Sequence, residues 1–252
     1  MTASNTTQQS SNKPEEILVL YGSQTGNSEG AAQEICSLIP TKLKCCTSRV
    51  MHLDDFLELE KAQWTRLVVI VCSSYGVGQA PIGARKFREL CDEILLRHGE
   101  DDADNNTTNN KKISLEGVHF ALLGLGDSHY TTYFQNPTTI HNALTMAGAT
   151  HVGKLGKADA SGRDEMEQIK VIDRWIATIW DDLNRVIATT NTNSNNGVDK
   201  TNLDKARGDT WELCLELYPE WDKSKNYSAM ATLYLPLVGI VLALLAHFLF
   251  SG

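Results

Sequence analysis

Short apolar runs alternate with longer stretches of mixed polarity along most of the chain. The clearest runs are Ile17–Leu20, Leu67–Cys72 and His119–Leu123, and weaker ones are Cys45–Met51 and Thr150–Gly153. Continuous apolar runs of this length are typical of strands buried on both faces of a parallel sheet. Helical patterns lie between them, at Glu29–Ile39, Ile82–Arg97, Thr138–Ala147 and Asp164–Ile187. The alternation predicts an α/β domain with a doubly wound sheet.

Two polar, Asn-rich stretches interrupt this pattern, at Gly99–Lys112 and at Asn191–Asn202. Neither carries enough apolar surface to offset the entropy cost of ordering the chain. We expect the first to be a mobile insert between a helix and a strand, and the second to be a tether that leaves the domain. The segment Asp54–Gln63 also has a helical pattern, although its first two residues, both Asp, make a short turn equally plausible.

The C-terminal tail, Ala229–Phe250, contains no Asp, Glu, Lys or Arg. At about 1.5 Å per residue, its roughly 20 apolar positions reach about 30 Å, the thickness of the hydrocarbon core of a bilayer. The alternative is a buried core helix, but so uniformly apolar a helix at the end of a small domain has nowhere to be buried. The tail therefore predicts a transmembrane helix. Lys223 and Lys225 would then stay on the cytosolic side, as the positive-inside rule favours.

The segment before the tail, Asp209–Lys225, places aromatic and apolar residues at helical spacing against three Glu residues. This pattern fits a short interfacial helix and, equally well, a spacer with aromatic membrane anchors. The predicted organisation is a disordered N-terminus at residues 1–14, an α/β domain at 15–190 with a mobile insert at 99–112, a linker at 191–228 and a transmembrane tail anchor at 229–250.

Composition and charge exclude several functions. The 252 residues suffice for one α/β domain plus extensions, but not for two full catalytic domains. The formal net charge of -8 argues against binding of nucleic acid and suits partners with basic docking faces. The six cysteines include no C-x-x-C pair, which disfavours a structural zinc site or a disulfide framework. Residues 1–14 lack the apolar stretch of a secretory signal, so the folded part is expected to face the cytosol.

The residues that follow the apolar runs carry the candidate chemistry, because an open parallel sheet binds ligands at the carboxyl ends of its strands. After the first run the chain reads Tyr21-Gly22-Ser23-Gln24-Thr25-Gly26-Asn27-Ser28-Glu29 and enters a helical segment. Hydroxyl side chains and backbone amides at a helix N-terminus form an anion site. The loop has no Lys or Arg, so amides and hydroxyls alone would hold a phosphate there. A simple helix cap is the alternative.

Two further loops, Ser73–Pro81 and Gly124–Asn136, each carry an aromatic ring among glycines. A planar heterocycle can be sandwiched between Tyr75 and Tyr130 while nearby backbone groups hydrogen-bond its polar edge. Neither loop has the G-x-G-x-x-G pattern of dinucleotide-binding folds, because Pro81 and His129 occupy the last positions.

Three motifs in these regions occur in the order of a known family. They are Leu122-Leu123-Gly124-Leu125-Gly126-Asp127-Ser128, Tyr130-Thr131-Thr132-Tyr133-Phe134-Gln135-Asn136, and Trp175-Ile176-Ala177 with Trp180. With them, the stretch from about Glu16 to Asn184 resembles the FMN-binding flavodoxin-like domain of the diflavin reductases, the group that includes cytochrome P450 reductase and methionine synthase reductase. The resemblance implies a flavodoxin-like, five-stranded parallel sheet of order 2-1-3-4-5 and FMN as the cofactor.

The resemblance also implies roles for individual residues. The loop that wraps the FMN phosphate corresponds to Ser23, Gln24, Thr25, Gly26, Asn27 and Ser28. The loop whose Tyr75 covers one face of the isoalloxazine corresponds to Ser73, Ser74, Tyr75, Gly76, Val77 and Gly78. The loop whose Tyr130 covers the other face corresponds to Leu125, Gly126, Asp127, Ser128, His129 and Tyr130. Further candidate contacts are Phe134, Asn136 and, near the ribityl chain, Asp159.

Two positions depart from the family pattern. Val77 and Gln79 stand where the reductases usually carry acidic residues, which removes negative charge beside the flavin. In addition, no FAD- and NADPH-binding module follows residue 190. The donor of electrons is therefore expected to be a separate protein.

The favoured hypothesis is an FMN-dependent carrier that takes electrons from a separate NAD(P)H-dependent flavin reductase and passes them to a membrane-bound acceptor such as a haem protein. This task requires no catalytic residue and no metal. The alternative is a flavodoxin-shaped adaptor that has lost FMN and recruits partners to the membrane. The departures at Val77 and Gln79 motivate it, and the intact phosphate loop and tyrosines oppose it. A quinone reductase that uses NAD(P)H directly would need a nicotinamide site, which we do not find.

The uncharged Ser-Gly terminus favours the endoplasmic reticulum over the mitochondrial outer membrane.

Overall fold

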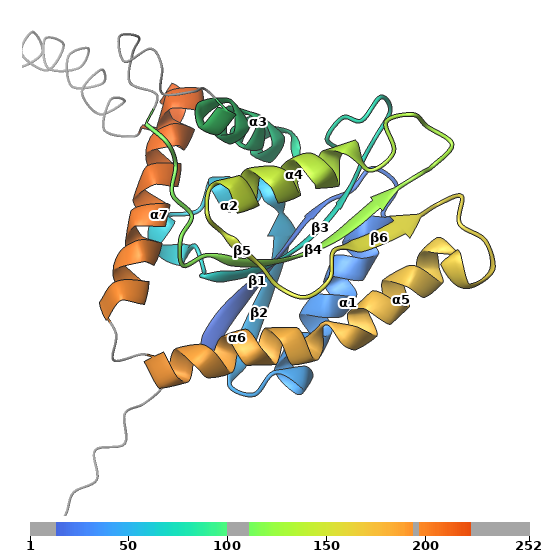
Figure 1. Cartoon of the computed structure of the whole chain (residues 1–252), viewed down its shortest axis with the longest axis horizontal. Helices are drawn as coiled ribbons and strands as arrows, with labels where there is room; N and C mark the ends of the chain where they lie inside the picture. The colour runs from blue at the N-terminus through green and yellow to red at the C-terminus, as the bar shows by residue number, and fades with distance from the viewer. Residues whose placement is uncertain (1–13, 100–110, 194–196, 223–252) are drawn as a thin grey trace, which may run out of the picture. The chain divides into compact units, whose positions relative to one another are not determined.

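The computed structural model describes residues 14–99, 111–193 and 197–222 (Figure 1). Three predicted segments lie wholly or mostly outside these ranges: the polar N-terminus, the centre of the Asn-rich insert at 100–110, and the transmembrane anchor at 229–250. Within the described ranges, we find no helix with the length and hydropathy of a bilayer-spanning segment.

The sheet is parallel, and its strands are β1 (Glu15–Gly22), β2 (Cys46–His52), β3 (Leu67–Ser73), β4 (His119–Gly126), β5 (Thr150–His151) and β6 (Gly156–Asp159). Their order is β2-β1-β3-β4-β5, which confirms the predicted order. The fifth position is shared, because β5 pairs with the start of β4 and β6 pairs with its end. The pattern of apolar runs missed β6, since only Gly156 and Ala158 of its four residues are buried.

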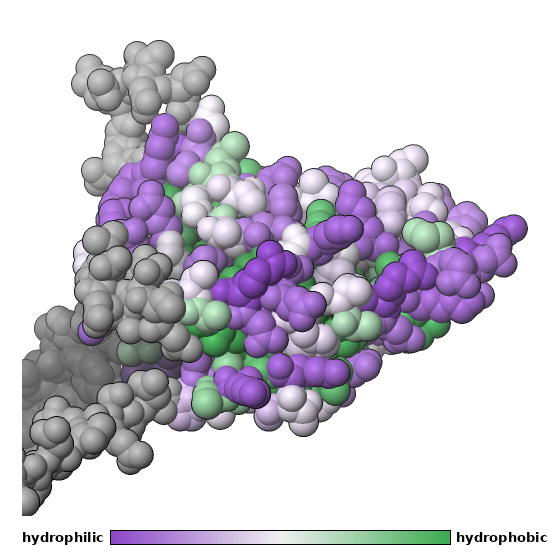
Figure 2. Space-filling model, turned by 60° about the horizontal axis from the view of Figure 1, so that its bottom comes forward, coloured by the Kyte–Doolittle hydropathy of each residue, from purple (hydrophilic) through white to green (hydrophobic). Residues whose placement is uncertain are grey.

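Helices cover both faces of this sheet (Figure 1). One face carries α1 (Asn27–Lys42), α5 (Gln168–Thr178) and α6 (Trp180–Asn193), and the other carries α2 (Leu53–Leu57), α3 (Arg85–Gly99) and α4 (Gln135–Met146). Alternate residues of the central strands enter the two layers, so Ile17 and Val19 pack in the same core cluster as Ile35 of α1 and Trp175 of α5. The outer surface over α5 and α6 is mainly hydrophilic (Figure 2).

The single helix predicted over Asp164–Ile187 is divided in the structure. A short 3-10 helix, η2 (Asp164–Met166), comes first, and extended Glu167 separates it from α5. A second break at Ile179 separates α5 from α6. Ile176, Ile179 and Leu183 are all buried in the core, so both helices pack against the domain across the break.

The predicted tether and linker also differ from the structure. The sequence predicts a tether over Asn191–Asn202, but α6 continues to Asn193 and a further helix, α7, spans Gly197–Leu217. The segment Asp209–Lys225 is helical only to Leu217 and is followed by the 3-10 helix η3 (Pro219–Trp221). Composition alone could not reveal this helix, because tertiary contacts hold it. For Asp54–Gln63, both interpretations hold in part, since α2 ends at Leu57 and the 3-10 helix η1 (Lys61–Gln63) follows.

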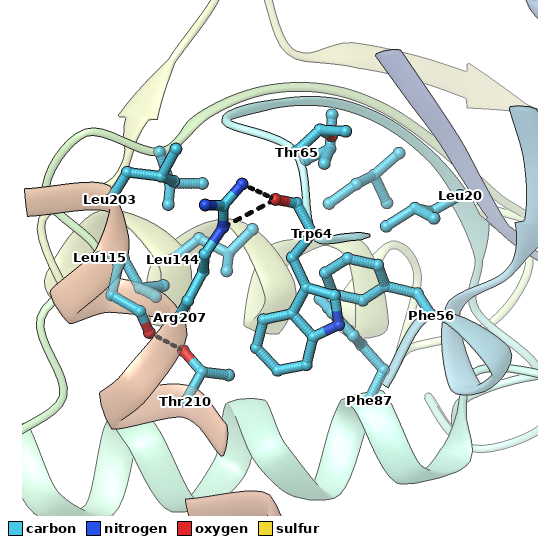
Figure 3. A pocket seen from close by; sticks show the side chains of 14 residues that line it. Leu20, Phe56, Trp64, Thr65, Phe87, Leu115, Leu144, Leu203, Arg207 and Thr210 are labelled. Carbon is cyan, nitrogen blue, oxygen red and sulfur yellow. Dashed lines mark hydrogen bonds between the residues drawn. The ribbon is translucent and has the colours of Figure 1, made fainter. Parts of the chain in front are cut away.

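The contacts of α7 involve two charged residues in its middle. Arg207 donates hydrogen bonds from Nε, at 2.9 Å, and from Nη2 to the main-chain oxygen of Trp64 (Figure 3). Asp209 is 4% exposed and forms ion pairs with Lys111 and Lys205, both at 2.7 Å. Beside Arg207, apolar side chains of the sheet, α2, α3, α4 and α7 enclose a cavity of about 60 Å³. Residues of α7 up to Thr210 are therefore part of the folded domain.

We expect Arg207→Met to lower the free energy of unfolding by about 1–2 kcal/mol, because the variant loses two hydrogen bonds from a charged donor to Trp64 O in a half-buried setting, together with the surface ion pair to Asp204. Urea unfolding of the full chain measures this change. Arg174→Met is the matched control, since Arg174 is more than half exposed and, within the described ranges, its side chain pairs with Glu165 on the surface. The control should shift stability by less than about 0.5 kcal/mol. Equal shifts in the two variants would contradict the anchoring role of Arg207.

Candidate functional site

A cavity of about 640 Å³ opens at the carboxyl ends of β1, β3 and β4. Its volume lies in the usual range for sites of small molecules and cofactors. The three loops singled out by sequence all contribute to its wall, through Gln24, Thr25, Asn27, Ser28, Ser73, Ser74, Tyr75, Gly76, Val77, Leu125, Gly126, Asp127 and Tyr130. None of the described residues that line the cavity is Lys or Arg.

The first loop turns sharply between β1 and α1. Gly26 has φ of +94°, a conformation that favours glycine, and its N–H donates a hydrogen bond to Ser23 Oγ at 3.0 Å. α1 then begins at Asn27. Ser28 is only 1% exposed, and its hydroxyl has no hydrogen-bond partner among the described residues. A buried hydroxyl without a partner, at the start of a long helix and on the cavity wall, fits an anion that would accept its hydrogen bond.

The second loop holds Tyr75 at the cavity mouth. The backbone N–H and C=O groups of Tyr75 and Gln79 pair at 2.9 and 2.8 Å, and Gly76 and Gly78 between them both have positive φ. In this closed turn Tyr75 is 46% exposed and Val77 75% exposed. The aromatic face is therefore available to a flat ligand.

Asn136 fixes the base of the second loop and does not line the cavity. It is fully buried, its amide donates to Ser73 O at 3.0 Å, and its backbone N–H donates to Ser74 Oγ at 3.0 Å. Arg88 of α3 donates to the side-chain oxygen of Asn136 at 3.2 Å and to Gly78 O at 3.4 Å. The role of Asn136 in the structure is to join β3, α3 and α4 behind the loop.

The third loop is held against the residues that follow β6. The Asp159 carboxylate accepts hydrogen bonds from the backbone N–H groups of Ser128, at 2.9 Å, and Ser161, at 3.0 Å. Asp127 accepts one from the Ser161 hydroxyl at 2.5 Å and one from the backbone N–H of His129 at 3.0 Å. These bonds fix the backbone that leads into Tyr130, and Tyr130 itself is 59% exposed.

Phe134 supports the floor of the site from within the domain. It is buried, and a Cβ atom added at Gly124 would lie 2.3 Å from its ring. Glycine at position 124 therefore makes room for Phe134 at the point where β4 approaches the cavity.

Hydrogen bonds keep two carboxylates of the site charged. The Ser161 hydroxyl, followed by the groups of His129, lowers the pKa of Asp127. Burial by itself raises the pKa of Asp159, but hydrogen bonds from Ser128 and Ser161 outweigh it, and the net shift of this pKa is downward. The end of the cavity beside Tyr130 is thus negative at neutral pH.

Asp159→Asn should lower the free energy of unfolding by about 1 kcal/mol at pH 7, since an amide oxygen accepts the two N–H bonds less strongly. The lowered pKa means that the stabilisation by the carboxylate is complete above pH 3.8 and is lost as the pH falls through the folded-state value. The difference between parent and variant, measured by urea unfolding, should shrink below pH 3.8. Asp173→Asn, on the exposed side of α5, is the control and should change little at either pH. If the stability difference between parent and Asp159→Asn stayed the same from pH 7 to below pH 3.8, the lowered pKa of Asp159 would be contradicted.

The structure brings together most of the predicted site residues. Those that lie outside the cavity wall are Ser23, Gly26, Gly78, Ser128, His129, Phe134, Asn136 and Asp159. They hold or shape the loops, and any direct contact with a cofactor stays a prediction. Residues that line the cavity without having been predicted are Gln79, Thr132, Tyr133, Ala160 and Gln168. Thr132 and Tyr133 lie inside the motif Tyr130–Asn136, whereas no motif or pattern in the sequence points to Gln168.

Comparisons with known proteins show which proteins this chain is similar to. The family model described as flavodoxin matches residues 19–173. The bifunctional cytochrome P450/NADPH–P450 reductase 1 of Bacillus subtilis is 34% identical over 172 residues, which are 68% of this chain and 14% of that protein. The methionine synthase reductase of Caenorhabditis elegans is 29% identical over 164 residues, 65% of this chain and 22% of that protein. The chain thus spans less than a quarter of either relative. Oxidised flavodoxin 1 of Bacillus cereus superposes with a TM-score of 0.46 and 20% identity, covering 65% of this chain and 95% of that one.

Proposed function

The chain belongs to the flavodoxin family, and we propose that it is a membrane-anchored electron carrier that receives electrons from a separate NAD(P)H-dependent flavin reductase and delivers them to a membrane-bound acceptor such as a haem protein. FMN, the predicted cofactor, is confirmed by the family match. When bound, FMN would supply the transfer of single electrons.

The observation that carries the proposal is the single cavity formed by three loops from the ends of β1, β3 and β4. Its residues fit FMN in two respects. At one end, the unpartnered Ser28 hydroxyl and the first turn of α1 suit a phosphate. At the other, the exposed rings of Tyr75 and Tyr130 suit stacking against a flat heterocycle.

The chain's own residues would act by binding and orientation. Thr25, Asn27 and Ser28 would hold the phosphate without a cation, through hydroxyls, an amide and the helix N-terminus. Tyr75 and Tyr130 would hold the ring and exclude water from its faces. Asp127 and Asp159 keep negative charge near one end of the site, while Val77 and Gln79 leave the second loop uncharged. The loops thus set the electrostatic surroundings of the flavin.

The proposed location is the cytosolic face of a membrane, preferably that of the endoplasmic reticulum, with residues 229–250 as a tail anchor. The uncharged apolar tail supports this topology. Confinement of carrier and acceptor to one surface raises their effective concentration without a tight interface. The relative from Bacillus subtilis is named for a P450 and a P450 reductase, which supports a haem protein as the acceptor. The negative charge of the chain supports a partner with a basic docking face.

The decisive experiment is the visible spectrum of the full chain, purified in mild detergent, before and after addition of FMN. We expect a flavin absorption band that survives gel filtration and is reduced by a flavin reductase with NADPH. A colourless protein that takes up no FMN would refute the carrier and favour the adaptor.

Topology is tested separately. A reporter fused after Gly252 should lie across the membrane from the flavin domain, and the protein should resist extraction by alkaline carbonate. Extraction into the supernatant would remove the anchor from the proposal and leave the FMN site untouched.

A further inference from the structure

Gln168 lies between two loops that the sequence treats as independent. It is the first residue of α5, and its side chain lines the same cavity as Thr25, Tyr75 and Tyr130. Its Oε1 accepts a hydrogen bond from Asn27 Nδ2, in the first loop, at 2.9 Å. Its Nε2 donates to Ala158 O, in β6, at 3.3 Å and to Gly126 O, at the start of the third loop, at 3.5 Å. The carboxamide therefore bridges the phosphate end and the ring end of the cavity.

The hydrogen-bonding capacity of this amide is only partly used. A Gln side chain offers two N–H donors and two acceptor lone pairs. Oε1 has one partner in Asn27, and both Nε2 contacts are longer than the usual N–H···O distance. One lone pair of Oε1 and much of the donor capacity of Nε2 thus have no partner among the described residues, and the residue lines the cavity. An amide with both functions suits a chain of hydroxyl groups, since each hydroxyl donates and accepts.

We infer that the Gln168 carboxamide hydrogen-bonds the polyhydroxyl chain that joins the ring of FMN to its phosphate. Gln168 lines the cavity together with Thr25 and Tyr130 and bonds to residues of both of their loops, Asn27 and Gly126. The inference rests on the proposed function, namely that this cavity holds FMN. It differs from a purely structural role, in which Gln168 would only tie Asn27 to β6.

Three flavins separate these roles: FMN, riboflavin, which lacks the phosphate, and lumiflavin, which also lacks the polyhydroxyl chain. We would titrate each into flavin-free full-length protein and follow the quenching of flavin fluorescence. Gln168→Leu should bind FMN and riboflavin about five- to tenfold more weakly, the effect of one hydrogen bond, and should bind lumiflavin as the parent does. Gln33→Leu, on an exposed position of α1 outside the cavity, is the matched control and should leave all three affinities unchanged.

Each other outcome has a definite meaning. Equal weakening of all three flavins would show a brace or a folding defect and overturn the inference, and unchanged FMN binding would overturn it as well. Weakening of FMN alone would place the effect on the phosphate, through Asn27, and also overturn it. A parent protein that binds none of the flavins would refute the proposed function itself.

Discussion

Thr25→Asp should abolish the retention of FMN by the purified protein. Thr25 lines the cavity in the turn before α1, where the phosphate is proposed to bind. Two unit charges about 4 Å apart repel by about 4 kcal/mol at the effective dielectric constant of a protein surface, which corresponds to roughly a thousandfold loss of affinity. None of the described residues lining the cavity is a cation that could neutralise the added carboxylate. The repulsion would therefore act at nearly full strength at low salt.

Two controls isolate the charge. Thr25→Ser keeps the hydroxyl and should bind FMN within a fewfold of the parent. Riboflavin, without the phosphate, should bind Thr25→Asp and the parent alike, because no second charge is present to repel. Thr25 is exposed, so the substitution should leave the unfolding curve of the flavin-free protein unchanged. Loss of riboflavin as well as FMN would mean that the loop had collapsed, and would contradict the phosphate assignment.

The central part of the fold was predictable because local pattern and tertiary environment agree there. β1, β3 and β4 are buried on both faces, and their sequences are continuous apolar runs. Residues that follow these strands must meet at one edge of the sheet, so Thr25, Tyr75 and Tyr130 could be placed in one site from sequence alone. The physical constraint is the topology of a parallel sheet, which does not depend on details of the loops.

The other parts of the fold and of the site depend on contacts between distant residues, which leave no pattern in the local sequence. β6 forms because Gly156 and Ala158 pack beside the end of β4, although the segment lacks the apolar run of a typical buried strand. α7 looks like a polar linker, and Arg207 and Asp209 become informative only once Trp64 and Lys111 are known to face them. Asn136 lies outside the cavity wall, and its amide donates to Ser73 O and Cys72 Sγ behind the loop, so its contact with the flavin stays a prediction. Gln168 reaches the site only because α5 begins there.

Tyr130→Ala should weaken FMN binding by about tenfold to hundredfold, because stacking of a heterocyclic base on an aromatic side chain contributes about 1–3 kcal/mol. The ring is mostly exposed in the flavin-free protein, so little folding energy is lost with it. The bonds from Ser128 to Asp159 and from Ser161 to Asp127 fix the backbone beside Tyr130. A ring on a fixed backbone contributes more to affinity than one on a mobile loop, because less backbone entropy is lost on binding.

Tyr130→Phe is the matched control, since it keeps the aromatic face and removes only the hydroxyl. It should bind FMN within about threefold of the parent if stacking is the source of the affinity. Fluorescence titration of flavin-free protein measures both variants, and lumiflavin should show the same loss as FMN in Tyr130→Ala because the ring is the part that stacks. Lumiflavin isolates this contact from the contacts of Thr25 and Gln168, which act on the phosphate and on the hydroxyl chain. A Phe variant as weak as the Ala variant would assign the energy to the hydroxyl, and unchanged affinity in both would remove Tyr130 from the site.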